Sequence, residues 1–118
     1  MEGENQYQQN NIEQHTQDIL TFLEVYTPQE WQPTSFKKFQ FQIIWFPEDV
    51  ADQSTFFSRS TQIDGYDIYI SPNLNAEDRK RQLFHELLEI MLNEDGLPDH
   101  DVHELTLGEE QRIFGVRK

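Results

Sequence analysis

The sequence YDIYISPNLNAEDRKRQLFHELLEIMLNEDG, residues 66–96, decides the fold of this chain. Residues 66–70 form a short apolar strand, and the Pro/Asn-rich residues 71–75 form a turn. Asn75 is suited to cap a helix and Asp78 to complete a capping box, while Gly96 is suited to end the helix. Between these signals, apolar residues recur at three- and four-residue spacing: Leu83, Phe84, Leu87, Leu88 and Met91. The stretch therefore predicts a strand, a turn and a long amphipathic helix.

The predicted helix carries a group of residues that could bind a metal ion. His85 and Glu89 are four residues apart, so their side chains leave one face of the helix, with Glu86 about 100° around the axis. Zinc hydrolases use a similar helix, His-Glu-x-x-His, in which the two His are ligands and the Glu acts on the metal-bound water. Here Glu89 replaces the second His, and its harder oxygen donor makes Mn or Fe competitors of Zn. The alternative is a solvated acidic helix face without a metal.

Length and composition indicate one small domain. Residues 1–10 are polar and Gln/Asn-rich, which predicts a disordered N-terminal tail, with a single domain over residues 11–118. Apolar spacing predicts a helix over about residues 11–26, which Pro28 ends.

Charge and cysteine content exclude several classes of function. A net charge of −13 argues against phosphate-directed nucleic-acid binding and against anionic membrane surfaces. No stretch approaches the length of a membrane span, and the N-terminus lacks the apolar core of a signal peptide. The chain contains no cysteine, which excludes disulfides, thiol catalysis and Cys-based zinc sites and fits the cytoplasm.

The remaining patterns predict strands before the long helix and shorter helices after it. Alternating apolar residues predict a half-buried strand over residues 39–46, which could also align an extended peptide as an edge strand. Asp64-Gly65 predicts a two-residue hairpin turn that places Ile63 opposite Tyr66. Asp101 with Glu104, and Thr106 with Glu109, have the spacing of capping pairs and predict one or two short helices after residue 98. We therefore expect an α+β domain with an N-terminal helix, a three-stranded, mainly antiparallel sheet, a long helix and a short C-terminal helix.

A catalytic metal needs a third protein ligand, and the C-terminal region supplies the candidates. The side chains able to serve are His100, His103, Glu104, Glu109 and Glu110. Sequence spacing does not choose among them.

Residues 68–75 and 81–89 resemble the core of small zincin-like metallopeptidases of the ImmA/IrrE type. In that family, a strand and a short Pro/Asn turn precede a helix reading R-x-x-x-A-H-E-L-G-H, and a Glu on a following helix, in a pattern like E-A-x-x-F-A, is the third ligand. Residues 110–115 are similar to the second pattern. The chain departs from the first pattern at Phe84, Leu88 and Glu89. The resemblance implies a zincin-like fold with His85, Glu89 and Glu110 as metal ligands and Glu86 as general base.

Two functions follow as expectations. The first is a cytoplasmic zincin-like metallopeptidase, or a degenerate relative, in which a metal-activated water attacks a peptide carbonyl; the metal is Zn, with Mn or Fe as alternatives. The second is a catalytically inactive, acidic protein-interaction module on the same fold, which binds a basic partner and needs no cofactor. Glu89 in place of His and the net charge of −13 favour the second.

Overall fold

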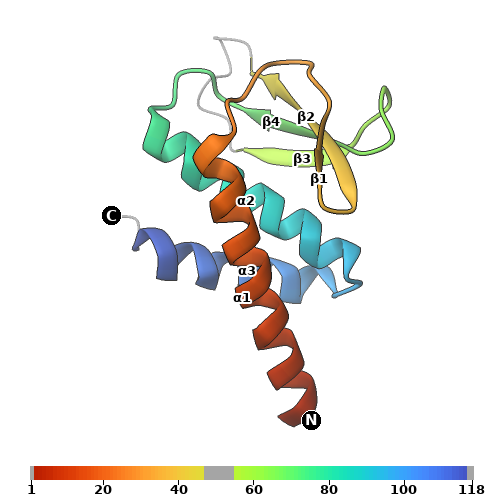
Figure 1. The fold of residues 1–118 in the computed structure, drawn as a ribbon, viewed down its shortest axis with the longest axis vertical. Coiled ribbons are helices and arrows are strands. Elements are labelled where there is room, and N and C mark those ends of the chain that lie inside the picture. Colours follow the sequence, from red (N-terminus) through yellow and green to blue (C-terminus); the bar gives the residue numbers. More distant parts are fainter. Residues whose placement is uncertain (1, 47–54, 117–118) are drawn as a thin grey trace. The chain divides into compact units, whose positions relative to one another are not determined.

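The computed structural model describes residues 2–46 and 55–116. Figure 1 shows their helices and strands in chain order: α1 (Glu2–Val25), β1 (Thr34–Phe36), β2 (Phe39–Trp45), β3 (Phe56–Arg59), β4 (Tyr66–Ile70), α2 (Ala76–Glu94) and α3 (Asp99–Phe114). They form two compact units. A helical unit contains Met1–Tyr26 and Leu83–Lys118, and a sheet unit contains Thr27–Gln82, so α2 begins in the sheet unit and continues into the helical one.

The sheet unit contains a four-stranded mixed sheet with the order β1-β2-β4-β3. The two outer pairs are antiparallel, and the central pair β2–β4 is parallel, with Phe41 opposite Tyr66. The predicted α+β class is confirmed, but the sheet has four strands instead of the predicted three, and its central pair is parallel. A two-residue turn at Lys37 and Lys38, with Lys37 at a φ of 56°, adds the short strand β1.

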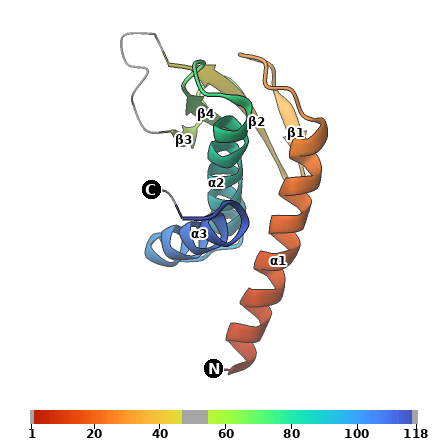
Figure 2. The same cartoon turned by 90° about the vertical axis from the view of Figure 1, so that its left-hand side faces the viewer.

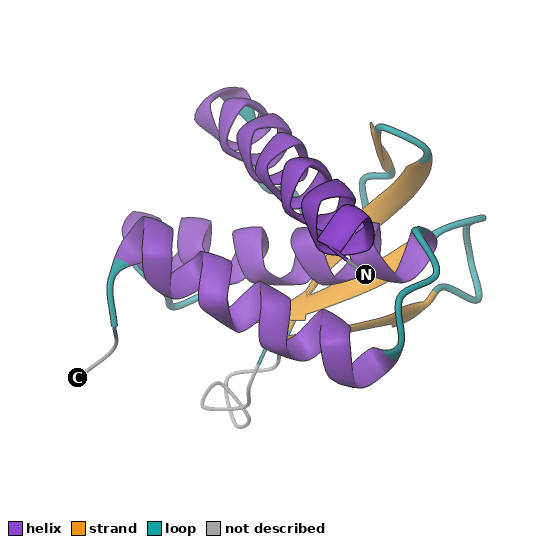
Figure 3. Ribbon diagram, turned by 90° about the horizontal axis from the view of Figure 1, so that it is seen from below, coloured by secondary structure: helices purple, strands orange, loops and turns teal. Residues whose placement is uncertain are grey.

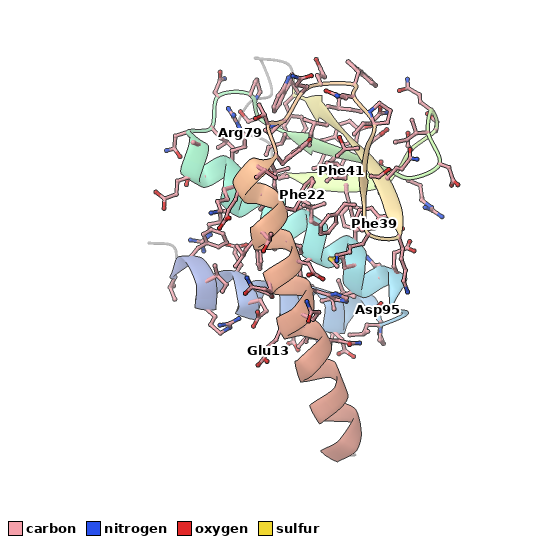
Figure 4. The ribbon with its side chains drawn as sticks, in the orientation of Figure 1. Glu13, Phe22, Phe39, Phe41, Arg79 and Asp95 are labelled. Atoms are coloured by element: carbon pink, nitrogen blue, oxygen red, sulfur yellow. The ribbon has the colours of Figure 1, made fainter. Side chains whose placement is uncertain are left out.

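Strand β2 lies inside the sheet, where Phe39 and Phe41 are buried (Figure 4). β1 and β4 occupy its two edges. On the β1 side, the backbone N–H of Trp31 also donates to the carbonyl of Ile43 at 3.0 Å. Because both edges are paired, the interpretation of this strand as an edge for peptide alignment is wrong.

The hairpin of β3 and β4 exists, but its register differs from the predicted one. Arg59, not Ile63, lies opposite Tyr66. The hydroxyl of Ser60 accepts the backbone N–H groups of Gln62 and Ile63, both at 3.1 Å, so the connection closes as a wider loop. The predicted two-residue turn at Asp64-Gly65 is therefore wrong.

Helix α2 begins and ends as the sequence predicts. The Oδ1 atom of Asn75 accepts the backbone N–H of Asp78 at 2.8 Å. At the other end Gly96 has a φ of 87°, and its N–H donates to the carbonyl of Asn93 at 2.9 Å. The N–H of Leu97 reaches the carbonyl five residues earlier at 3.3 Å, which completes a Schellman motif.

The helical unit brings α2, from Leu83 onward, and α3 side by side, with α1 crossing both (Figures 2 and 3). α1 starts at Glu2, whereas the sequence indicated a disordered tail over residues 1–10 and a helix from about residue 11. The added residues include Gln and Glu, which favour helix, and no proline.

Helix α3 is one continuous helix of 16 residues, so a C-terminal helix is present as predicted, but it is single and longer than expected. It starts at Asp99, which places the expected capping residues Asp101 and Thr106 inside the helix. Thr106 is fully buried there, and α3 continues through both Thr106 and Gly108. Among the described residues, no helix combines the length and the apolar character needed to cross a bilayer.

Two glycines give a matched test of this packing. A Cβ at Gly65 would overlap the backbone carbonyl of Gln40, so Gly65→Ala is expected to destabilise the fold by about 2 kcal/mol. Gly108→Ala meets nothing within 4 Å and is expected to stabilise α3 by about 0.5–1 kcal/mol. Urea unfolding of the two variants measures both effects, and equal changes in unfolding free energy would contradict the described sheet.

Candidate metal centre

The imidazole of His85 lies at the centre of a polar cluster inside the helical unit. Its Nδ1 lies 2.6 Å from Oε1 of Glu110, which comes from α3. Its Nε2 faces Oε2 of Glu89, one turn further along α2, at 3.4 Å. The ring is therefore held between one carboxylate from its own helix and one from the neighbouring helix.

His103 completes the cluster from α3. Its Nδ1 lies 3.5 Å from Oε2 of Glu89, and its ring meets that of His85 edge-on, with 6.4 Å between centroids. One ligand atom from each of His85, Glu89 and His103 falls within 4.8 Å of the others. Glu89 is partly buried and His103 is exposed, so the cluster opens toward solvent on the His103 side.

The two separations that involve Glu89 are longer than a well-formed hydrogen bond. Nitrogen–oxygen hydrogen bonds are about 2.7–3.2 Å long. In a tetrahedral zinc site with bonds of about 2.0–2.1 Å, neighbouring ligand atoms are about 3.3 Å apart. The 3.4 Å and 3.5 Å separations of Glu89 from His85 and His103 are close to that value, whereas the three ligand atoms together span up to 4.8 Å, so the two imidazoles would have to move closer to bind one ion. Together the three side chains could hold one divalent ion.

The neighbouring acids Glu109 and Glu110 point to different helices. Glu110 meets His85 of α2, whereas Glu109 accepts the hydroxyl of Thr16 from α1 at 2.7 Å. Arg112 donates two hydrogen bonds to the same carboxylate, at 2.9 Å and 2.8 Å. The hydrogen bonds from Arg112 hold the pKa of Glu109 below its usual range, with a further contribution from Thr16. Glu109 is therefore a tether between α1 and α3.

The structure brings together His85 and Glu89 of the predicted ligand set, and of the other candidates only His103 joins them. Glu110 lies instead against the opposite ring nitrogen of His85. His100 and Glu104 are exposed and face each other at 3.6 Å. Sequence reasoning did not find the tether of Thr16 and Glu109, although the i, i+3 pairing of Glu109 with Arg112 was a usable signal.

Glu86 is buried, with 3% of its surface exposed, beside this cluster. Burial raises the pKa of its carboxyl to about 8; the charge of His85 opposes the increase, and Glu89 and Glu110 add to it. Burial alone would lower the pKa of His85, but polar contacts with Glu89 and Glu110, together with the charges of Glu89 and Glu86, raise it to about 9. The metal-free cluster thus holds protons on both groups at neutral pH.

No protein-family model, curated protein or solved structure matches this chain. The case for a function therefore depends on the geometry of the cluster.

These protonation states predict how stability depends on pH. Glu86 is neutral in the folded protein up to about pH 8 but ionises near pH 4.5 when unfolded, so rising pH favours unfolding between these values. His85 keeps its proton up to about pH 9 when folded, against 6.5 unfolded, so its contribution is also lost as pH rises. The melting temperature of metal-free protein is expected to fall between pH 5 and 9.

Glu86→Gln provides the control, because glutamine has the same shape and does not titrate. It is expected to flatten the pH profile of the melting temperature below pH 8. A profile identical to that of the unmodified protein would exclude burial of a titrating carboxyl at this position.

Proposed function

We propose that this protein is a zinc-dependent peptidase of zincin-like type, with the metal held by His85, Glu89 and His103. The observation that carries the proposal is that one ligand atom from each of His85, Glu89 and His103 lies within 4.8 Å of the others, with Oε2 of Glu89 at 3.4 Å and 3.5 Å from the two imidazoles. Two imidazoles and one carboxylate are a donor set used by catalytic zinc sites, which leave the fourth position to water or substrate. The ligand set implied by the sequence contained one histidine, whereas this set contains two. The additional imidazole donor favours Zn over Mn or Fe.

Glu110 has a supporting role at this centre. It accepts the Nδ1–H of His85 and so fixes the tautomer in which Nε2 is free to bind a metal. Carboxylates placed behind a ligand histidine orient its ring and raise its basicity. The role of third ligand, which the sequence resemblance implied for Glu110, passes in this proposal to His103.

Zinc bound here would supply Lewis acidity to a peptide carbonyl and to water. Glu86 is the proposed general base, because it follows the first ligand in sequence and lies close enough to feel the charges of His85, Glu89 and Glu110. A divalent cation bound beside Glu86 would lower the pKa of this carboxyl, so that the ionised Glu86 could take a proton from the attacking water and pass it to the leaving amine.

Metal binding is the first test. Isothermal titration of metal-free protein with Zn²⁺ is expected to give one site per chain. Zn²⁺ binding should be abolished in each of three variants, because each lacks one ligand: His85→Gln, Glu89→Gln and His103→Gln. Glu110→Gln keeps all three ligands and is expected to weaken binding by about 10–100-fold.

His100→Gln is the matched control, because His100 lies on the same helix outside the cluster. Equal losses in the His100 and His103 variants would show that Zn²⁺ binds loosely to the acidic surface.

Catalysis is tested by Glu86→Gln. The variant is expected to retain Zn²⁺ but to lose hydrolysis of an unstructured peptide library by at least about 100-fold, since general base catalysis typically contributes that much. Mass spectrometry of the cleaved peptides measures the rate. Unchanged cleavage would assign the base to another group.

An inactive, acidic interaction module is the second candidate. Two features support this candidate. The net charge is −13, and without a metal the protonated His85 is already paired with two carboxylates. Absence of Zn²⁺, Mn²⁺ and Fe²⁺ binding, together with salt-sensitive binding of a Lys/Arg-rich peptide, would favour this module over the peptidase.

A further inference from the structure

A second contact of α3, on a different face from the one that meets His85, joins it to α1. Thr16 is 3% exposed, and its hydroxyl donates to Oε2 of Glu109 at 2.7 Å. The buried side chains Ile12 and Ile19 leave the same face of α1 as Thr16, since they are four and three residues away. The hydroxyl is thus fixed within the packed face of α1, and Glu109 is fixed by it.

Glu109 directly precedes Glu110, so the two side chains diverge by about 100° around the axis of α3. Their partners lie on different helices, Thr16 on α1 and His85 on α2. Because an α-helix turns as a unit, the contact on one side sets where the other carboxylate points. His103 lies seven residues before Glu110, two turns along nearly the same face, and follows the same rotation.

We propose that Thr16 is a positioning residue for the His85–Glu110 pair, which it aligns by holding Glu109 and thereby fixing the rotation of α3. A side-chain atom about 6 Å from a helix axis moves about 1 Å when the helix turns by 10°. Metal and catalytic groups need placement within about 0.5 Å. A small rotation of α3 therefore separates Glu110 from His85 and displaces His103 from Glu89. The consequence for zinc depends on the proposed function, whereas the alignment of Glu110 with His85 does not.

Thr16→Val tests the proposal, because valine has nearly the same shape and lacks the hydroxyl. In the metal-free variant, the Nδ1–H proton signal of His85 in the NMR spectrum is expected to disappear, as its hydrogen bond to Glu110 loosens. Zn²⁺ affinity is expected to fall about tenfold, and the visible spectrum of bound Co²⁺ to change. Thr16→Ser restores the hydroxyl and should restore all three readouts.

His15→Gln is the control for a general loosening of α1. His15 also joins α1 to the rest of the helical unit, through Asp95 just beyond the end of α2, at 2.8 Å (Figure 4 labels Asp95). Loss of the His15–Asp95 contact should leave the His85 signal and the Co²⁺ spectrum unchanged. The positioning role is overturned if His15→Gln and Thr16→Val have the same effect. It is also overturned if Thr16→Val keeps both the His85 proton signal and the Co²⁺ spectrum of the unmodified protein.

Thr16→Ala provides a second route if Thr16→Val does not fold. Alanine also lacks the hydroxyl that donates to Glu109, and it places no additional methyl group beside the carboxylate. The same loss of the His85 signal is expected, and an unchanged signal would contradict the proposal. The two proposals can fail separately. If the wild-type protein binds no metal but its His85 signal still depends on Thr16, the zinc site is refuted and the positioning role is supported.

Discussion

The placement of His85 between two carboxylates is the constraint on which the functional centre depends. Glu110 approaches one ring nitrogen from α3 and Glu89 approaches the other from α2. The partly buried imidazole keeps its proton because both nitrogens face carboxylates, since desolvation otherwise favours the neutral form. This arrangement links α2 with α3 at one rotational setting and also places His103 beside Glu89.

The parts of the fold that could be predicted from the sequence are those set by short-range signals. Asn75 and Gly96 mark the ends of α2 because capping bonds form between residues a few positions apart. The parallel pairing of Phe41 with Tyr66 could not be predicted, because it joins strands that are distant in the chain and carries no turn signature. Ser60 likewise replaced the expected tight turn with a wider loop.

The candidate centre was predictable to the same extent. His85 and Glu89 share a face because of their i, i+4 spacing, which any helix enforces. The choice between His103 and Glu110 depends on where α3 begins and how it is rotated. That rotation is fixed by Thr16 and Glu109, which are 93 residues apart in the sequence, so helical periodicity alone could not supply it.

The central claim is that two histidines and Glu89 form one zinc site supported from behind by Glu110. Crystals grown with Zn²⁺ and measured at the zinc absorption edge test it most directly. We expect one strong anomalous peak about 2.0–2.2 Å from Nε2 of His85, Nδ1 of His103 and a Glu89 oxygen, with Glu110 still on Nδ1 of His85. A peak that includes Glu110 as ligand and leaves His103 in solvent, or no peak at this cluster, would contradict the account.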